Sequence, residues 1–453
     1  MTTGELYKWA LRLAIPIMIQ NLIETLVNTA DTIMLGFVGQ TEMAASSLAN
    51  QYTFVLTCIF FGMATATSVL CAQYWGKGDH KTIERVIGLA ARVSILASLL
   101  FTVVSFLFPQ WIMRLFTSSP DTISIGAQYL KILSLSFVFM AITQVYISAL
   151  RSVGKVLFPS VVAVVGLCVN IVLNASFIFG LFGLPKMGVI GVALGTVIAR
   201  ITEVILCVIY SMNSEIKFRI KYIFSRAGVL TRDFLKICLP AIGNDLVWSL
   251  ATTVFTVILG HMGDDIVAAN AVAVMVVNIG AIAERGFANS TTIVIGQTLG
   301  ANLIEETKEY ALKLVKLTAY VAAAGCIVII ALRPVIIGFY SDKLSAQAIS
   351  YLGMMMYMTT YRMIGEGVNT CLICGCFRGG GDTKYGLYMD MIMMWLVAIP
   401  IMVIAAYVLK LPPIWVYFAM TLDEIEKMPF IFIHFFKYKW LRNITRDESE
   451  LSV

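Results

Sequence analysis

The chain has 453 residues, of which 59% are hydrophobic and only 13% are charged. Soluble domains carry about 25% charged residues, so this composition excludes an ordinary soluble domain and indicates a membrane protein with many spanning segments. The formal net charge of +6 is spread over short loops and forms no basic domain, which argues against a nucleic-acid partner.

The first eight residues, MTTGELYK, are polar, and no small-residue cleavage site follows the first apolar run. We therefore expect no signal peptide, and we predict that this first run is itself a spanning helix. Apolar runs separated by polar residues predict twelve spanning helices in all. Their ranges are 11–37, 46–72, 87–109, 126–150, 157–182, 188–212, 234–260, 266–298, 310–338, 346–377, 385–408 and 413–436.

An even number of spans leaves both termini on one side of the membrane. Most lysines and arginines fall in the loops of that side, among them GKGDHK and RGGGDTK, and few fall in the opposite loops. The positive-inside rule then predicts a protein of the cell inner membrane with both termini in the cytoplasm.

The two halves of the chain repeat each other at a shift of 224 residues, where Pro16 aligns with Pro240 and Gly39 with Gly263. Each half holds six helices, so the halves share one orientation, as in many secondary transporters. The fold class predicted is an all-α membrane protein of two pseudo-symmetric six-helix lobes. The predicted domains are an N-terminal lobe (1–212), a connector (213–233), a C-terminal lobe (234–440) and a cytoplasmic tail (441–453). The basic, aromatic connector is expected to lie along the lipid headgroups.

Polar residues recur inside the first predicted helix, although an ionised side chain at the centre of a span costs about 2.5–3.5 kcal/mol. Gln20, Glu24 and Asp31 fall on one helical face, with Asn28 close beside them. We interpret this face as the lining of a watered cavity. The alternative is a hydrogen-bond network that only pins helices together.

The fifth and sixth predicted helices add Asn170 and Asn174, four residues apart, and Thr196. Carboxylate, amide and hydroxyl oxygens suit Na⁺, and the same group could hold a proton on Asp31. For the asparagines, ordinary helix packing remains the alternative.

The second half carries its charges at different positions. Asp245 shares a helical face with Trp248 and is expected to have no adjacent cation, which favours a functional role. Arg362 and Glu366 are spaced for an i,i+4 ion pair. For Glu284 and Glu366 a structural ion pair and a transport role are both open.

Other polar motifs give no enzyme. RGGGDT lacks the lysine of a phosphate-binding loop, and the cysteines of CLICGCF are expected to pack rather than to bind metal. Arg200 with Glu203, and the acidic Asp423 and Glu424 of the last helix, are interpreted as interfacial or inter-helix pairs. We therefore expect no catalytic residues and no cofactor.

Several of these segments resemble the multidrug and toxic compound extrusion (MATE) family of bacterial transporters. The segments, in chain order, are ADTIMLGFVG, CAQYWGKGD, ALRSVGK, NIVLNASFIFG with GVIGVALGTVIAR, GQTLGA, FRGGGDTK and KYKW. The resemblance implies an antiporter that expels organic cations in exchange for inward H⁺ or Na⁺ through a cavity between two lobes.

The resemblance also implies roles for particular residues. The family's helix-1 aspartate matches Asp31, its helix-5 pair matches Asn170 and Asn174, and its helix-6 threonine matches Thr196. In the second half, Asp245 and Glu366 are the nearest matches to acids that some members use on helices 7 and 10. Some members carry an acid at the second helix-5 position, so Asn174 removes one negative charge and weakens a tight Na⁺ site.

The leading hypothesis is cation-coupled export of amphipathic organic cations by a monomer, with alternating access between the lobes. Tyr52, Trp248, Tyr361 and the MMMYM run at 354–358 would supply soft aromatic and methionine walls. A flippase of lipid-linked precursors is the first alternative, although its cavity should be cationic. An intramembrane enzyme or a channel is the alternative from another class.

Overall fold

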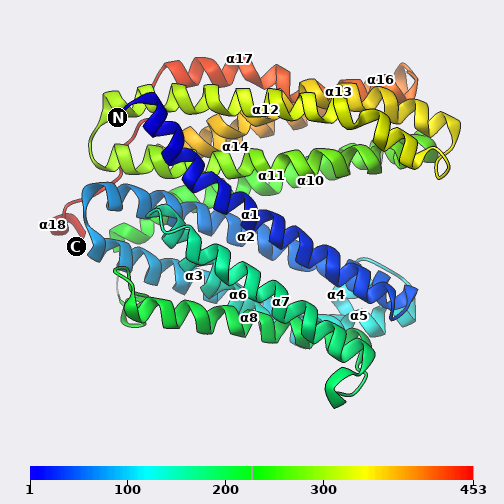
Figure 1. Ribbon diagram of the computed structural model, residues 1–453, viewed down its shortest axis with the longest axis horizontal. Helices are drawn as coiled ribbons and strands as arrows, with labels where there is room; N and C mark the ends of the chain where they lie inside the picture. Colours follow the sequence, from blue (N-terminus) through cyan, green and yellow to red (C-terminus); the bar gives the residue numbers. More distant parts are fainter. Residues whose placement is uncertain (226–227, 452–453) are drawn as a thin grey trace. The chain divides into compact units, whose positions relative to one another are not determined.

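The computed structural model describes residues 1–225 and 228–451, and every regular element in these residues is a helix (Figure 1). Residues 226 and 227 of the connector and the last two residues of the tail lie outside the described residues. The all-helical fold class predicted from the sequence is confirmed.

The chain forms two compact units, each described here by itself. We call residues 19–238 with 445–453 the first lobe, and residues 1–18 with 239–444 the second lobe. These units differ from the predicted domains at both ends of the chain. Met18, near the start of the chain, packs against Gly286 and so belongs to the second lobe. Arg446 of the tail is bound to Asp233, so the tail belongs to the first lobe.

The first lobe is built from helices of the first half of the chain, together with the start of α10 (Gly228–Gly260) and the tail helix. Neighbouring helices in the chain also pack together, and α7 and α8 run side by side in Figure 1. Its helices are α1 (Thr3–Gly36, from residue 19 onward), α2 (Gln40–Lys77), α3 (His80–Leu107), α4 (Pro109–Arg114), α5 (Pro120–Leu133), η1 (Ser134–Ser136), α6 (Phe137–Ser152), α7 (Leu157–Phe179), η2 (Leu181–Gly183), α8 (Gly188–Asn213), α9 (Lys221–Phe224), the start of α10 and the tail helix α18 (Glu448–Leu451).

The second lobe contains π-helical turns as well as α-helices, and π-turns occur frequently at functional sites. Its α13 packs against α11, α12 and α17. The elements are α10 (Gly228–Gly260, from residue 239 onward), α11 (Asp264–Gly300), α12 (Ile304–Tyr340), α13 (Ala346–Thr370), α14 (Thr383–Asp390), α15 (Ile399–Val403), α16 (Pro413–Thr421), α17 (Asp423–Phe436) and the π-helical η3 (Cys371–Phe377), η4 (Met391–Ala398) and η5 (Ile404–Val408).

All twelve predicted spans are helical. Ten helices of the described residues are long and apolar enough to cross a membrane. The other two predicted spans are α13 with η3, and the pair α16 and α17. Large apolar side chains such as Leu100 (63% exposed) and Leu396 (71% exposed) cover the outside of the lobes, as expected for helices that face lipid.

The first helix begins eight residues before the predicted span, and its polar start explains why. Thr2 accepts a hydrogen bond from the backbone of Glu5, and the Glu5 carboxylate accepts one from the backbone of Thr2. This reciprocal capping satisfies two amides that the first turn of a helix leaves unpaired. The helix therefore starts in the polar segment, ahead of the apolar run that predicted it.

Methionines of the second lobe lie in its core rather than along a cavity. Met355 and Met356, in the centre of the MMMYM run, are at most 1% exposed and pack with Met394 and Met402. For these two residues the packing interpretation holds, and the predicted substrate wall does not.

Candidate functional site

The predicted carboxylate, amide and hydroxyl groups of the first lobe meet in one hydrogen-bonded chain. Nδ2 of Asn174 donates to Oδ1 of Asp31 at 2.6 Å and is 3.2 Å from Oδ1 of Asn170. Nδ2 of Asn170 in turn donates to Oγ1 of Thr196 at 3.3 Å. Three helices, α1, α7 and α8, thus each contribute to one polar centre.

Close packing of α7 on α8 makes this centre possible. Asn170 and Asn174 are one turn apart on α7, which places both amides on one side of the helix. Oδ1 of Asn174 is only 2.3 Å from the place that a Cβ at Gly195 of α8 would take, so no larger residue fits there without a shift. That oxygen is buried and has no hydrogen-bond donor among the described residues, so it is open to a cation or to a carboxylic acid proton.

Gln20 does not share a network with Asp31, although the two lie on the same helical face. Gln20 is 1% exposed; its Nε2 donates to Ser160 at 2.8 Å, and its Oε1 accepts from Arg151 at 2.6 Å. All its polar atoms are used in holding helices together, so its predicted place in the cavity wall is wrong. Asn28, by contrast, is exposed.

A second charged group lies one turn from the Asp31 centre. Arg200 binds both carboxylate oxygens of Glu203 at 3.0 Å, and Glu203 packs against Gly166, one turn before Asn170 on α7. Glu203 is 7% exposed, so the pair, formed within α8, is covered by α7. Glu24 is half-buried and interacts electrostatically with Arg200.

The predicted aromatic wall residues are half-buried and partly committed to packing. The Tyr52 hydroxyl donates to the backbone of Phe101 at 3.2 Å. Tyr361 is hydrogen-bonded to Thr421, and Trp248 packs against the methionine-rich core of the second lobe. A ligand could therefore contact the faces of these aromatic rings rather than their polar atoms.

In the second lobe, Asp245 does have a cationic partner. Arg378, which follows η3, donates to Oδ1 of Asp245 at 2.9 Å and to Asn244 at 2.8 Å. The expectation that Asp245 has no neighbouring cation is therefore wrong, because the arginine lies 133 residues away in the sequence.

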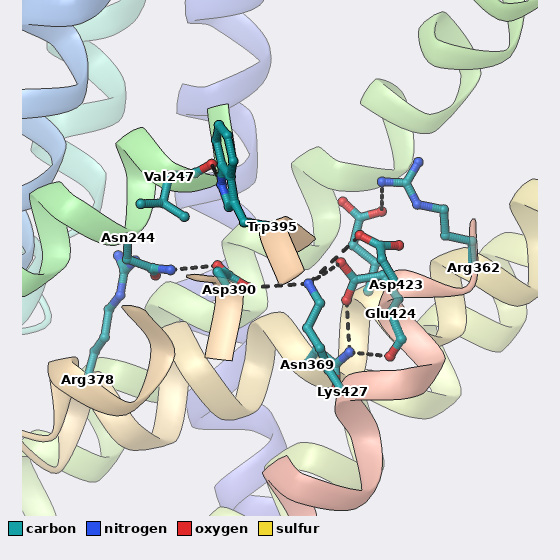
Figure 2. Close-up of polar contacts among 11 residues, drawn as sticks. Asn244, Val247, Arg362, Asn369, Arg378, Asp390, Trp395, Asp423, Glu424 and Lys427 are labelled. Atoms are coloured by element: carbon teal, nitrogen blue, oxygen red, sulfur yellow. Dashed lines mark hydrogen bonds and ion pairs between the residues drawn. The ribbon is translucent and has the colours of Figure 1, made fainter. Parts of the chain in front are cut away.

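Asn244 links this pair to a buried cluster on α14 and α17 (Figure 2). Its amide donates to Asp390 at 2.6 Å. Nζ of Lys427 lies 3.3 Å from Asp390 and 3.0 Å from Glu424, and it is 3.9 Å from Asp423. Asp423 and Glu424 are at most 4% exposed, and Glu424 accepts a hydrogen bond from Asn369 of α13 at 2.8 Å, so the inter-helix alternative holds for Glu424.

Glu284 of α11 and Glu366 of α13 border the same cluster. Arg362 and Glu366 form the predicted i,i+4 ion pair at 3.7 Å. Glu284 is 6% exposed, packs against Gly367, next to Glu366 in the chain, and interacts electrostatically with Glu366 and Glu424.

Sequence reasoning missed three members of this cluster, Asn244, Asp390 and Lys427. Two signals were present: Lys427 stands three residues after Glu424 and four after Asp423, and Asp390 directly precedes an apolar run. What the sequence could not supply was the meeting of α10, α14 and α17.

No group of three histidine, cysteine, aspartate or glutamate side chains in residues 1–225 and 228–451 is arranged to hold a metal ion. The cysteines of CLICGCF instead contribute to the core, where Cys371 and Cys376 are fully buried beside Phe377 and Trp440.

Two repeated sets of spanning helices, each with carboxylates and amides buried inside it, define a multi-pass membrane transporter of the two-lobed type. The chain belongs to the MatE family, whose model matches residues 16–176 and 240–404. The two matched stretches begin at Pro16 and Pro240, the pair that defined the internal repeat. Members of this family are transporters and not enzymes.

Named relatives agree with this membership. The chain is 26% identical over 388 residues to the uncharacterized transporter YisQ of Bacillus subtilis, covering 85% of this chain and 84% of the relative. It is 23% identical over 456 residues to the probable multidrug resistance protein NorM of Thermotoga maritima, covering 98% and 95%.

Solved structures show the same fold. The bent form of the MATE transporter VcmN of Vibrio cholerae superposes with a TM-score of 0.87 at 18% identity, covering 96% of this chain and 97% of the other. The outward-facing conformation of a multidrug resistance MATE transporter gives 0.86 at 19% identity, with 95% of each chain covered.

Proposed function

We propose that this protein exports amphipathic organic cations across the cell inner membrane in exchange for inward H⁺ or Na⁺. Membership of the MatE family and likeness to proteins described as multidrug resistance transporters support small-molecule efflux. The observation that carries the coupling role is the 2.6 Å hydrogen bond from Asn174 to the carboxylate of Asp31 inside a spanning helix.

Asp31 is the group whose charge changes during the cycle. As a carboxylate it accepts the hydrogen bond of Asn174 and attracts a cation; as a neutral acid it can donate its proton to the open Oδ1 of the same amide. Asn170 and Thr196 add a carbonyl and a hydroxyl oxygen, which a Na⁺ ion could share with Asp31. Exchange follows because an Asp31 that holds the ion no longer supports substrate binding.

The substrate would be cationic because the polar interior carries more acids than bases. Glu24 of the first lobe and Glu284 of the second would supply negative charge, and the rings of Tyr52, Trp248 and Tyr361 would supply apolar faces that attract a cation. This charge balance disfavours the anionic pyrophosphate of a lipid-linked precursor.

The proposed transporter works as a monomer by alternating access between its two lobes, and both of its termini are cytoplasmic. The internal repeat gives one chain both halves of a transport pathway. The concentration of lysine and arginine in one set of loops supports cytoplasmic termini.

Efflux from proteoliposomes tests the proposal. A fluorescent organic cation should leave vesicles under a pH gradient alone or a Na⁺ gradient alone, and Asp31→Asn should abolish whichever response exists. Asp121→Asn, which removes an exposed acid from the first turn of α5, is the matched control and should export normally. Efflux by Asp31→Asn at the wild-type rate, or efflux that neither gradient drives, would overturn the proposal.

A further inference from the structure

A buried ammonium stands among three carboxylates in the second lobe (Figure 2). The side chain of Lys427 is 3% exposed, and those of Asp390, Asp423 and Glu424 are at most 8% exposed. Their oxygens surround Nζ at distances from 3.0 to 3.9 Å. Hard oxygens converging on one buried point are the usual surroundings of a bound metal cation, and here the point is held by the chain's own ammonium.

Several buried oxygens in this part of the second lobe lack a hydrogen-bond donor among the described residues. They are both carboxylate oxygens of Asp423, Oδ1 of Asn369 and Oε1 of Glu284. All three residues are at most 6% exposed. Buried polar atoms are normally paired, so these oxygens indicate a ligand that supplies hydrogen or positive charge.

Carboxylates also outnumber cations in this buried region. The six acids are Asp245, Glu284, Glu366, Asp390, Asp423 and Glu424, and the three cations are Arg362, Arg378 and Lys427. Asp245, Glu366 and Arg362 are half-buried, and the other six are buried. Arg285 of α11 is exposed, and Tyr361 of α13 and Tyr417 of α16 contribute neutral phenols near Arg362. Among the described residues of this cluster, three carboxylates therefore have no matching cation, and an unpaired buried carboxylate is strongly unfavourable when ionised.

We propose that Lys427 is a resident cation that takes the place of a metal ion, so that the second lobe binds protons and excludes Na⁺. A Na⁺ ion could reach Asp390, Asp423 and Glu424 only by entering beside the ammonium, where like charges repel at low dielectric. A proton needs no such space and binds directly to the open oxygens of Asp423 and Glu284. The proposal rests on the proposed cation exchange, but it concerns only which ion this lobe accepts.

The test removes the ammonium in the purified full-length protein. Asp31→Asn serves as the background, because it takes the first-lobe carboxylate out of the measurement. Lys427→Met is added to one sample, and Lys384→Met, which removes an exposed lysine at the start of α14, is added to the matched control. Melting temperatures are compared in NaCl and in choline chloride of equal concentration at alkaline pH, and ²²Na⁺ binding is measured directly.

Only the Asp31→Asn/Lys427→Met protein should gain a Na⁺-specific rise in Tm and saturable Na⁺ binding. Na⁺ binding of equal strength in the Asp31→Asn protein would overturn the proposal, and so would a folded Lys427→Met protein that gains none. If that variant does not fold, Asp423→Asn/Lys427→Met removes one charge of each sign and should show the same gain more weakly.

A further measurement needs no change at Lys427. Titration of the Asp31→Asn protein with a pH indicator should record proton uptake that falls when Asp423→Asn is added and that Na⁺ does not displace. Displacement of these protons by Na⁺ would contradict the proposal. This experiment measures ion binding and not transport. Its result therefore tests the ion preference of the second lobe even if the protein fails to exchange cations in vesicles.

Discussion

Asn174 donates its side-chain amide to Asp31, 143 residues earlier in the chain, across 2.6 Å. The same amide keeps its Oδ1 without a donor among the described residues. The donor Nδ2 stabilises the carboxylate form of Asp31, and in the proposed cycle the amide oxygen would accept from its carboxylic acid form. Such a neighbour suits the proposed role of Asp31 as the group whose charge changes during transport.

Asp31→Asn should fold and reach the membrane but lose ion-driven efflux. The amide keeps the volume and hydrogen-bonding capacity of the acid, so stability should change by no more than about 1 kcal/mol, and loss of an intramembrane charge eases insertion. Drug resistance of cells that express equal amounts of wild type, Asp31→Asn and Asp121→Asn checks this. Wild-type resistance in Asp31→Asn would leave the acids of the second lobe as the carriers.

Gly195→Ala should disturb the same centre by steric contact alone. The new methyl carbon would lie 2.3 Å from Oδ1 of Asn174, too close for two unbonded atoms, and overpacking of this kind costs about 1–3 kcal/mol. Gly338→Ala is the control, because no atom lies within 4 Å of its added Cβ, and it should stabilise α12 by up to about 1 kcal/mol. The melting temperature and the rate of dye efflux should both fall for Gly195→Ala only. Equal behaviour of the two variants would show that Asn174 does not pack closely against Gly195.

Arg378→Met should destabilise the second lobe by about 3 kcal/mol, because it leaves Asp245 without its buried partner. The estimate is at the low end of the range because the Asp245 side chain is 25% exposed. Adding Asp245→Asn removes the uncompensated negative charge and should restore much of the lost free energy of unfolding. A double-mutant cycle by thermal unfolding measures the coupling, and strictly additive effects would show that the pair is not coupled.

The C-terminal tail should release from the first lobe in acid and in high salt. Its Arg446 binds Asp233, which raises the arginine's pKa. Hydrogen bonds and charge from Lys77 lower the pKa of Asp447, and those from Lys81 lower the pKa of Glu448. Carboxyl groups with lowered pKa values favour the docked tail above their ordinary pKa, and that contribution is lost as pH falls through the lowered values.

Hydrogen exchange of residues 445–451, corrected for intrinsic rates, measures this release. Protection should persist at neutral pH, fall below about pH 4, and fall at 1 M salt, where charges are screened beyond about 3 Å. Arg446→Gln should lower protection at neutral pH. Protection that neither salt nor acid changes would mean that ion pairs do not hold the tail.

Much of the second-lobe site could not be predicted because its pairs join distant residues. The sequence does predict the Arg362–Glu366 pair, which needs only helical spacing. Asp245 looks uncompensated in sequence, and only the fold brings Arg378 to it. Lys427 and Asp390 come from different helices, and their meeting gives the second lobe its resident ammonium.

The sequence by itself determined the spans, the internal repeat and the resemblance to the family. These depend on the length of apolar runs, which must match the thickness of a bilayer, and on residue spacing, which follows the helical period. Both are local properties of the sequence. Only the tertiary structure separated Gln20, bound to Arg151 and Ser160, from Asp31, bound to Asn174. Both side chains lie on one helical face, but buried polar groups take the partners that neighbouring helices offer, and helix packing decides which partners those are.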